Sequence, residues 1–178
     1  MENNSNILVY ADSMLELAQE MDKVREFQEQ FFHIENVLIH NPSLFTFLKS
    51  HMNSKTQRHE ILDSVFTKKV SEPVLNFLKI LIDKNLIFYW EKIFKRFTKN
   101  ADEISKIARG IIYSGFPMHT SQINKIVNLL AQKLNKNIIV EHRIDKNLLA
   151  GIKIVIDNHI FENSVASLLN QIKSDILK

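Results

Sequence analysis

The chain of 178 residues contains no cysteine and only three glycines and three prolines. Without cysteine it can have no disulfide framework, no thiolate metal site and no cysteine nucleophile. So few glycines leave little material for a phosphate-binding loop, and no Walker-type, dinucleotide-binding or GxSxG motif occurs. Scarce glycine and proline are typical of a helix-rich protein with short connections.

The sequence also lacks a long apolar run. None approaches the roughly 20 residues that a membrane-spanning helix needs. The opening stretch, MENNSNILVYADSMLELA, has no basic segment followed by a continuous apolar one, so it does not resemble a secretory signal. We therefore expect a soluble protein that does not itself insert into a membrane.

The histidines do not form a metal-binding pattern. Zinc ligands on one helix lie three or four residues apart, whereas His33 and His40, and likewise His51 and His59, are seven and eight apart. No HExxH motif occurs. The carboxylates of Asp102 and Glu103 are adjacent in sequence, and adjacent side chains on a helix point in different directions. The sequence predicts no catalytic residues, no metal and no cofactor, which argues against an enzyme.

Charge is present but mixed. Charged residues make up 24% of the chain and hydrophobic residues 45%, a globular composition, and the net charge is +3. Nucleic-acid-binding proteins concentrate their basic residues on one face. Here acids and bases are interspersed, which favours an ordinary solvated surface. A small basic RNA- or DNA-binding protein with helical and α/β modules remains the alternative function.

Residues 1–105 read as helix. Apolar residues repeat at helical spacing in six segments separated by short breaks. Ser54 followed by Gln57 fits a capping box, and Ser71 with Pro73 suits the start of the next helix. Three of the predicted helices span 5–21, 23–40 and 86–105. Between the second and the last lie a short helix that begins at Asn41-Pro42 and includes Leu44 and Leu48, a helix that Ser54 opens and that buries Ile61 and Phe66, and a helix that Ser71 and Pro73 open and that continues through residues 74–85. The sequence thus predicts an all-helical bundle domain over residues 1–105.

The first and fifth of these helices carry more apolar surface than one core requires. The first has a full apolar stripe and a second, partial one through Leu8, Tyr10 and Leu15. The fifth is apolar around most of its circumference between Val74 and Ile82. Such helices are either central in their bundle or docked against a partner, and the pattern leaves both readings open.

From residue 106 the pattern changes to sheet. β-Branched and alternating segments predict strands over 107–114, 138–144, 152–156 and 159–161. Helical spacing predicts one helix capped by Thr120 and a second capped by Asn163. We expect a small α/β domain over residues 106–178, a short sheet with two helices, and hence an α+β protein overall.

One segment of this second domain resembles a known family. Residues 144–154 and 160–165 are similar to the C-terminal signature of the delta (oligomycin-sensitivity-conferring protein) family of ATP synthase subunits. Six residues match it: Asp145, Leu148, Ala150, Gly151, Ser164 and Val165. Family-like positions in the helical part are Tyr10-Ala11, Leu17-Ala18, Glu20, Asn41-Pro42, Leu44, Phe47-Leu48 and Asn76-Phe77-Leu78. Glu162-Asn163 departs from the usual Asp-Gly, and Ala166-Ser167 stands where many members carry Arg-Gly.

The resemblance implies a non-catalytic stator, or peripheral stalk, subunit of an F-type ATP synthase. Its helical domain would bind the N-terminal helix of a catalytic-head alpha subunit through the first and fifth helices. Residues 106–178 would hold the b subunit, at the cytoplasmic face of the cell membrane. No nucleic-acid partner is implied. We hypothesise that the alpha-subunit groove is lined by Tyr10, Ala11, Met14, Leu75, Leu78 and Ile82, although core packing could explain each of them.

Overall fold

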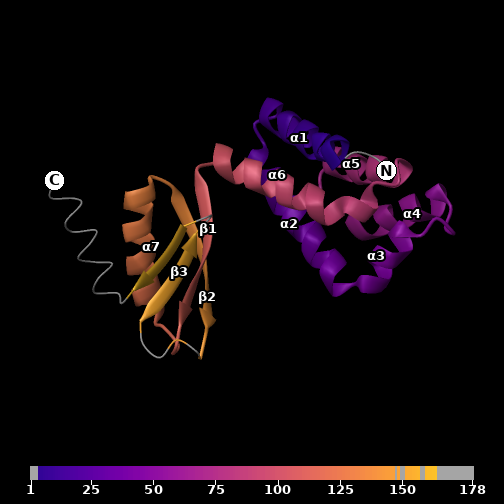
Figure 1. Ribbon diagram of the computed structural model, residues 1–178. Coiled ribbons are helices and arrows are strands. Elements are labelled where there is room, and N and C mark those ends of the chain that lie inside the picture. Colours follow the sequence, from indigo (N-terminus) through magenta and orange to yellow (C-terminus); the bar gives the residue numbers. More distant parts are fainter. Residues whose placement is uncertain (1–3, 147, 149–150, 157–158, 164–178) are drawn as a thin grey trace. The chain divides into compact units, whose positions relative to one another are not determined.

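The computed structural model describes the backbone of residues 4–146, 148, 151–156 and 159–163 (Figure 1). The chain separates into two compact units, Met1–Ala101 and Asp102–Lys178. The division falls within helix α6 (Trp90–Ile104), whereas the sequence placed it just after that helix. No helix among the described residues is both long enough and apolar enough to cross a membrane.

The first unit is a bundle of six α-helices, as the sequence predicts. They are α1 (Asn4–Glu20), α2 (Val24–His40), α3 (Pro42–Lys49), α4 (Lys55–Phe66), α5 (Glu72–Asp83) and α6, preceded by the 3₁₀ turn η1 (Ile87–Tyr89). The predicted single helix over 86–105 therefore begins as a 3₁₀ turn. That turn follows shortly after Asn85, whose left-handed φ of 56° lies just beyond the end of α5.

Helices α1 and α5 end in the same way. Asp22 and Asn85 adopt left-handed φ angles of 54° and 56° just beyond them. Lys23 N–H donates to Ala18 O at 2.8 Å, and Leu86 N–H donates to Leu81 O at 2.6 Å. These are the long hydrogen bonds of Schellman motifs, which satisfy carbonyls that a helix end otherwise leaves unpaired.

The helical core is built around aromatic rings. Phe31 of α2 is fully buried and stacks on Phe97 of α6, with ring centroids 4.0 Å apart. Its ring also lies 5.3 Å from Trp90 and 5.8 Å from Phe77 of α5. Burial of large aromatic side chains is among the strongest contributions to stability, so this cluster fixes α2, α5 and α6 against one another.

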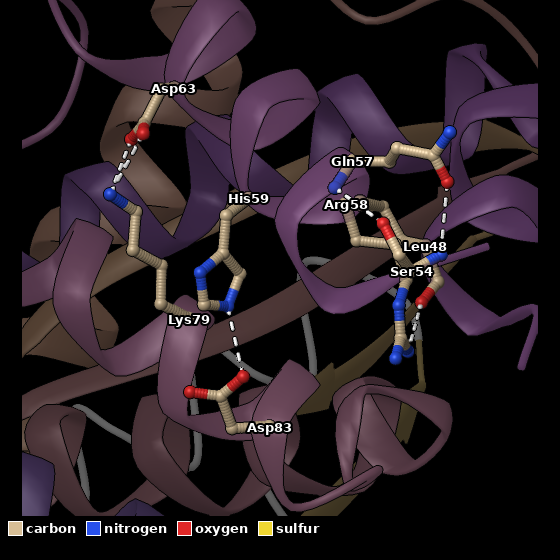
Figure 2. Close-up of polar contacts among 8 residues, drawn as sticks. All are labelled: Leu48, Ser54, Gln57, Arg58, His59, Asp63, Lys79 and Asp83. Atoms are coloured by element: carbon tan, nitrogen blue, oxygen red, sulfur yellow. Dashed lines mark hydrogen bonds and ion pairs between the residues drawn. The ribbon is translucent and has the colours of Figure 1, made fainter.

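Polar side chains at the helix surfaces add further ties between helices. Figure 2 shows two between α4 and α5: Lys79 Nζ lies 2.7 Å from Asp63 Oδ1, and His59 Nε2 lies 3.1 Å from Asp83 Oδ1. Elsewhere in the unit, the Arg96 guanidinium pairs with the carboxylate of Asp12 and joins α6 to α1. These contacts connect neighbouring helices at their surfaces but contribute little energy where exposed.

The predicted helix caps differ in outcome. The capping box at α4 is confirmed, because Gln57 N–H donates to Ser54 Oγ and Gln57 Oε1 accepts from Ser54 N–H. Ser71 is the N-cap residue of α5, but its hydroxyl donates to Gln30 Oε1 on α2 at 2.8 Å. The tertiary contact with Gln30 therefore replaces the local cap at α5.

The second unit contains a mixed sheet. Its elements are β1 (Ile107–Ser114), α7 (Thr120–Leu134), β2 (Asn137–Ile144), β3 (Ile152–Ile156) and β4 (His159–Asn163). The strand order is β2-β1-β3-β4; β1 runs parallel to β2 and antiparallel to β3, which pairs antiparallel with β4. The overall α+β class is confirmed. The predicted helix from Asn163 lies outside the described residues.

Helix α7 covers one face of this sheet (Figure 1). Ile152, Ile154 and Ile156 alternate with less buried residues on β3, and all three join the core with Ile126 and Leu130 of α7. Alternation places every second side chain on the face that α7 covers. The cap of α7 differs from the sequence prediction, since helix 120–134 starts after His119, whose N–H donates to Gln122 Oε1.

Candidate functional site

An open pocket of about 550 Å³ lies between α1 and α5. Figure 1 shows these two helices as neighbours in the first unit. Four residues of each helix line it at the same spacing of i, i+3, i+4 and i+7. They are Tyr10, Ser13, Met14 and Leu17 of α1, and Pro73, Asn76, Phe77 and Ile80 of α5, with Glu72 beside Pro73. The lining is a continuous helical face on both sides.

The structure brings only two of the six predicted groove residues to this pocket. Tyr10 and Met14 line it. Ala11, Leu78 and Ile82 are at most 1% exposed, and Leu75 is 8% exposed; none of the four lines it. They belong to the core on the faces of α1 and α5 that point into the bundle.

The face of α5 that is open to the pocket is adjacent to the face that the sequence analysis predicted to line the groove. Asn76 and the half-exposed Ile80 stand on it, while Phe77 lies at its floor, 7% exposed, and contacts Phe31. On α1 the corresponding residues missed by the sequence reasoning are Ser13 and Leu17. One signal in the sequence could have identified this face. On each helix the lining residues repeat at i, i+3, i+4 and i+7 and include one polar residue, whereas a fully apolar stripe is typical of a core face.

The chemistry of the groove suits an amphipathic helix. Its floor is apolar, and the polar groups of Ser13 and Asn76 stand at equivalent positions on the two walls. Glu72 adds one carboxylate at the start of α5. Helix-in-groove recognition uses apolar anchors at helical spacing, and polar groups on the rim set register. No nucleophile with a base, and no metal-ligand set, is among the lining residues.

The signature segment of the second unit has a structural explanation. Asp145 N–H donates to Ser114 O at 2.9 Å, and Leu148 N–H donates to Asp145 O at 3.1 Å, which holds this turn at the end of β1. A Cβ at Gly115 would collide with the Leu148 carbonyl, so glycine is required there. Gly151 has a φ of 92°, a conformation that other residues rarely adopt. The signature residues Ala150, Ser164 and Val165 lie outside the described residues.

One serine–histidine pair arises from strand pairing and was not anticipated. Ser114 Oγ of β1 lies 2.7 Å from His142 Nε2 of β2. The same hydroxyl donates to Phe116 O at 2.6 Å, so its proton is already committed and His142 acts as the donor. A catalytic base must instead accept the hydroxyl proton. The pair ties neighbouring strands together and is not arranged for catalysis.

Within the part of the chain that the structure describes, no group of three or more histidine, aspartate or glutamate side chains could hold a metal ion. The candidate functional surface of the first unit is the open, largely apolar α1–α5 groove. A helical bundle with an open apolar groove, followed by a small mixed-sheet unit, defines a binding protein.

The family model of the ATP synthase delta (OSCP) subunit matches residues 8–176. The chain belongs to the ATP synthase delta (OSCP) subunit family. It is a non-catalytic component of the peripheral stalk, the stator of F-type ATP synthases. This match confirms the resemblance. Of the two functions that the sequence left open, it favours the stator subunit over the nucleic-acid-binding protein.

Individual relatives agree along the whole chain. The delta subunit of Mesomycoplasma hyopneumoniae strain 232 is 31% identical, over 97% of this chain and 92% of the relative. That of Clostridioides difficile strain 630 is 26% identical, over 94% and 93%. A chain in the cryo-EM structure of the Toxoplasma gondii mitochondrial ATP synthase hexamer is 15% identical, with a TM-score of 0.67 over 97% of each chain. This last likeness shows a shared fold.

Proposed function

We propose that the α1–α5 groove binds the N-terminal helix of an alpha subunit of the catalytic head. The observation that carries this proposal is the matched lining, in which both helices present residues at i, i+3, i+4 and i+7 around an apolar floor. An amphipathic helix laid between them would bury anchors at the same spacing. The groove is adequate in volume, at about 550 Å³, for several such side chains.

The floor of the groove is rigid, which favours tight binding. Phe77 contributes to the floor and also stacks against Phe31 in the aromatic core, so its ring does not have to be ordered when a partner binds. Pre-organised contact surfaces lose less conformational entropy on association than mobile ones. Met14, 3% exposed, lies opposite and can adjust to the shape of an incoming side chain.

The second unit, with residues 106–178, would hold the b subunit of the peripheral stalk. The chain then joins the catalytic head to the membrane sector at the cytoplasmic face of the membrane. Rotation of the central shaft exerts torque on the head, and the head would turn with the shaft unless it were tied down. Two binding surfaces on one chain provide that tie without any catalysis.

The groove is tested by titrating the full chain with a fluorescent peptide from the first helix of the alpha subunit of the same complex. Ile80→Glu places a charge on the groove wall, where Ile80 is 47% exposed, so folding should be preserved. We expect at least a tenfold loss of affinity, because a buried charge without a partner is costly. Fluorescence anisotropy measures the dissociation constant.

Ile39→Glu is the matched control, since Ile39 is also a solvent-accessible helical isoleucine, 61% exposed, and does not line the groove. It should bind the peptide as the natural chain does. Equal affinity of the two variants would reject the groove as the binding site. Co-purification of the tagged full chain with alpha and b subunits separates this function from nucleic-acid binding.

A further inference from the structure

A second pocket of the helical unit, about 200 Å³ in volume, is lined by side chains from α3, α4 and η1 and from the turn residues beside these elements. It is separate from the groove and shares no lining residue with it. Its lining includes three basic residues, Lys49, His51 and Arg58, and no acidic one. The other lining residues include Asn85, Phe88 and Tyr89. This charge pattern is unlike that of the groove, whose lining has one acid and no base.

Arg58 is the unusual member of this set. It is only 3% exposed, although arginine is rarely buried unless it is paired. Its Nη1 donates to Leu48 O at 3.3 Å (Figure 2), and its buried Nε has no hydrogen-bond partner among the described residues. No carboxylate in the described part of the chain forms an ion pair with it. A guanidinium buried without a counter-charge is costly, so the pocket it lines has a strong preference for an anion.

The other lining residues strengthen this preference. Lys49 Nζ lies 4.1 Å from the centroid of the Phe45 ring and 5.5 Å from that of Phe88. These aromatic contacts position the ammonium without neutralising it. His51 and the side-chain amide of Asn85 supply further hydrogen-bond donors.

The size of the pocket sets the class of ligand. At about 30 Å³ per water molecule, its volume of about 200 Å³ corresponds to roughly six or seven waters. That is enough for a carboxylate or a tetrahedral phosphate group, which have three to five heavy atoms. Arginine with lysine is also the donor set that recognises both groups through charge-assisted hydrogen bonds. We propose that this pocket binds an oxyanion of the carboxylate or phosphate type, with Arg58 and Lys49 supplying the charge.

The test is a titration of the full ¹⁵N-labelled chain with sodium phosphate, and separately with sodium acetate, at an ionic strength held constant with sodium chloride. We expect saturable shifts of the Asn85 side-chain amide and the His51 signals. Lys49→Gln should raise the dissociation constant about tenfold, because it removes one of the charges. Arg58→Met, which replaces the buried charge with an apolar side chain of similar length, should abolish saturation.

Lys68→Gln is the matched control, since Lys68 is exposed and does not line the pocket. It should leave the dissociation constant unchanged. Saturation by both anions supports a site that accepts a carboxylate, and saturation by phosphate alone limits the ligand to phosphate groups. The proposal is overturned if both titrations give only linear shifts, or if Lys49→Gln saturates as the natural chain does. Because Lys49→Gln leaves Arg58 in place, a folding defect of Arg58→Met cannot obscure the result.

Discussion

Phe31 is the residue around which the helical unit closes. Its ring contacts Phe77, Trp90 and Phe97, which come from α5 and α6. Phe31→Ala should lower the free energy of unfolding by about 3–5 kcal/mol, since it removes the buried ring and leaves a cavity. Trp90 is the sole tryptophan in the sequence, so urea unfolding followed by its fluorescence reports this unit.

The control for that variant is Ile39→Ala, because Ile39 is 61% exposed. Its free energy of unfolding should stay within about 0.5 kcal/mol of the natural value. Comparable losses in the two variants would show that the Phe31 cluster is not the centre of the core.

The indole of Trp90 gives a second prediction at this scale. Its Nε1–H donates to Glu35 Oε2 at 2.7 Å, and Trp90 is 1% exposed. Glu35→Ala should cost about 1–3 kcal/mol of unfolding free energy, because a buried donor is left unpaired. Glu35→Gln keeps an acceptor oxygen and should cost less. If urea unfolding gives equal losses for both, the hydrogen bond is not what stabilises this site.

At the scale of one element, α6 carries an ion pair across one turn. Lys95 Nζ lies 2.6 Å from Glu91 Oε1. The hydrogen bond from Lys95, and then its charge, lower the pKa of Glu91 below the ordinary value of 4.5. A carboxyl group whose pKa is lower in the folded state than in the unfolded state stabilises the fold at any pH above its unfolded pKa. That contribution is lost as the pH falls through the folded pKa.

A ¹³C NMR titration of the Glu91 carboxyl tests this pair. Its pKa should lie below 4.5 in the natural chain and move up toward 4.5 in Lys95→Gln. Added salt should produce part of the same change, since both groups are exposed. Lys84→Gln, an exposed lysine beyond the end of α5, is the control and should leave the Glu91 pKa where it was.

In the sheet, Gly110 allows β1 and β3 to approach. It pairs with Ile156, and a Cβ at this position would lie 2.5 Å from Val155 O. Gly110→Ala should destabilise the second unit by about 1–3 kcal/mol, because backbone cannot move aside as a side chain can. Hydrogen exchange of the β1 and β3 amides should speed up while Trp90 unfolding stays unchanged. Ile139→Ala on β2, 46% exposed, is the control.

At the scale of the whole molecule, the proposed function predicts an effect on coupling rather than on catalysis. In the assembled ATP synthase, Ile80→Glu should leave ATP hydrolysis by the head largely intact. ATP-driven ion pumping should fall several-fold, because a head that is not tied down turns with the shaft. Simultaneous measurement of hydrolysis and gradient formation in vesicles checks this. Loss of both activities to the same degree would contradict a stator role for the groove.

Local patterns along the chain determined most of the architecture. Helical periodicity located six helices, the Ser54–Gln57 capping box predicted the start of α4, and period-two alternation located β3. Each of these signals depends on residues within one or two turns, or on neighbouring positions in one strand. They can therefore be identified before any tertiary contact is known. The signature around Gly151 identified the family for the same reason.

Only the tertiary structure decided which apolar face of each helix stays open. Leu78 and Ile82 look as suitable for a groove as Ile80, yet the first two are buried in the hydrophobic core and Ile80 is left half exposed. The burial of Arg58 likewise could not be foreseen, because its neighbours come from separate elements of the chain. Periodicity shows that a face is apolar; what covers that face is decided by packing between elements distant in sequence.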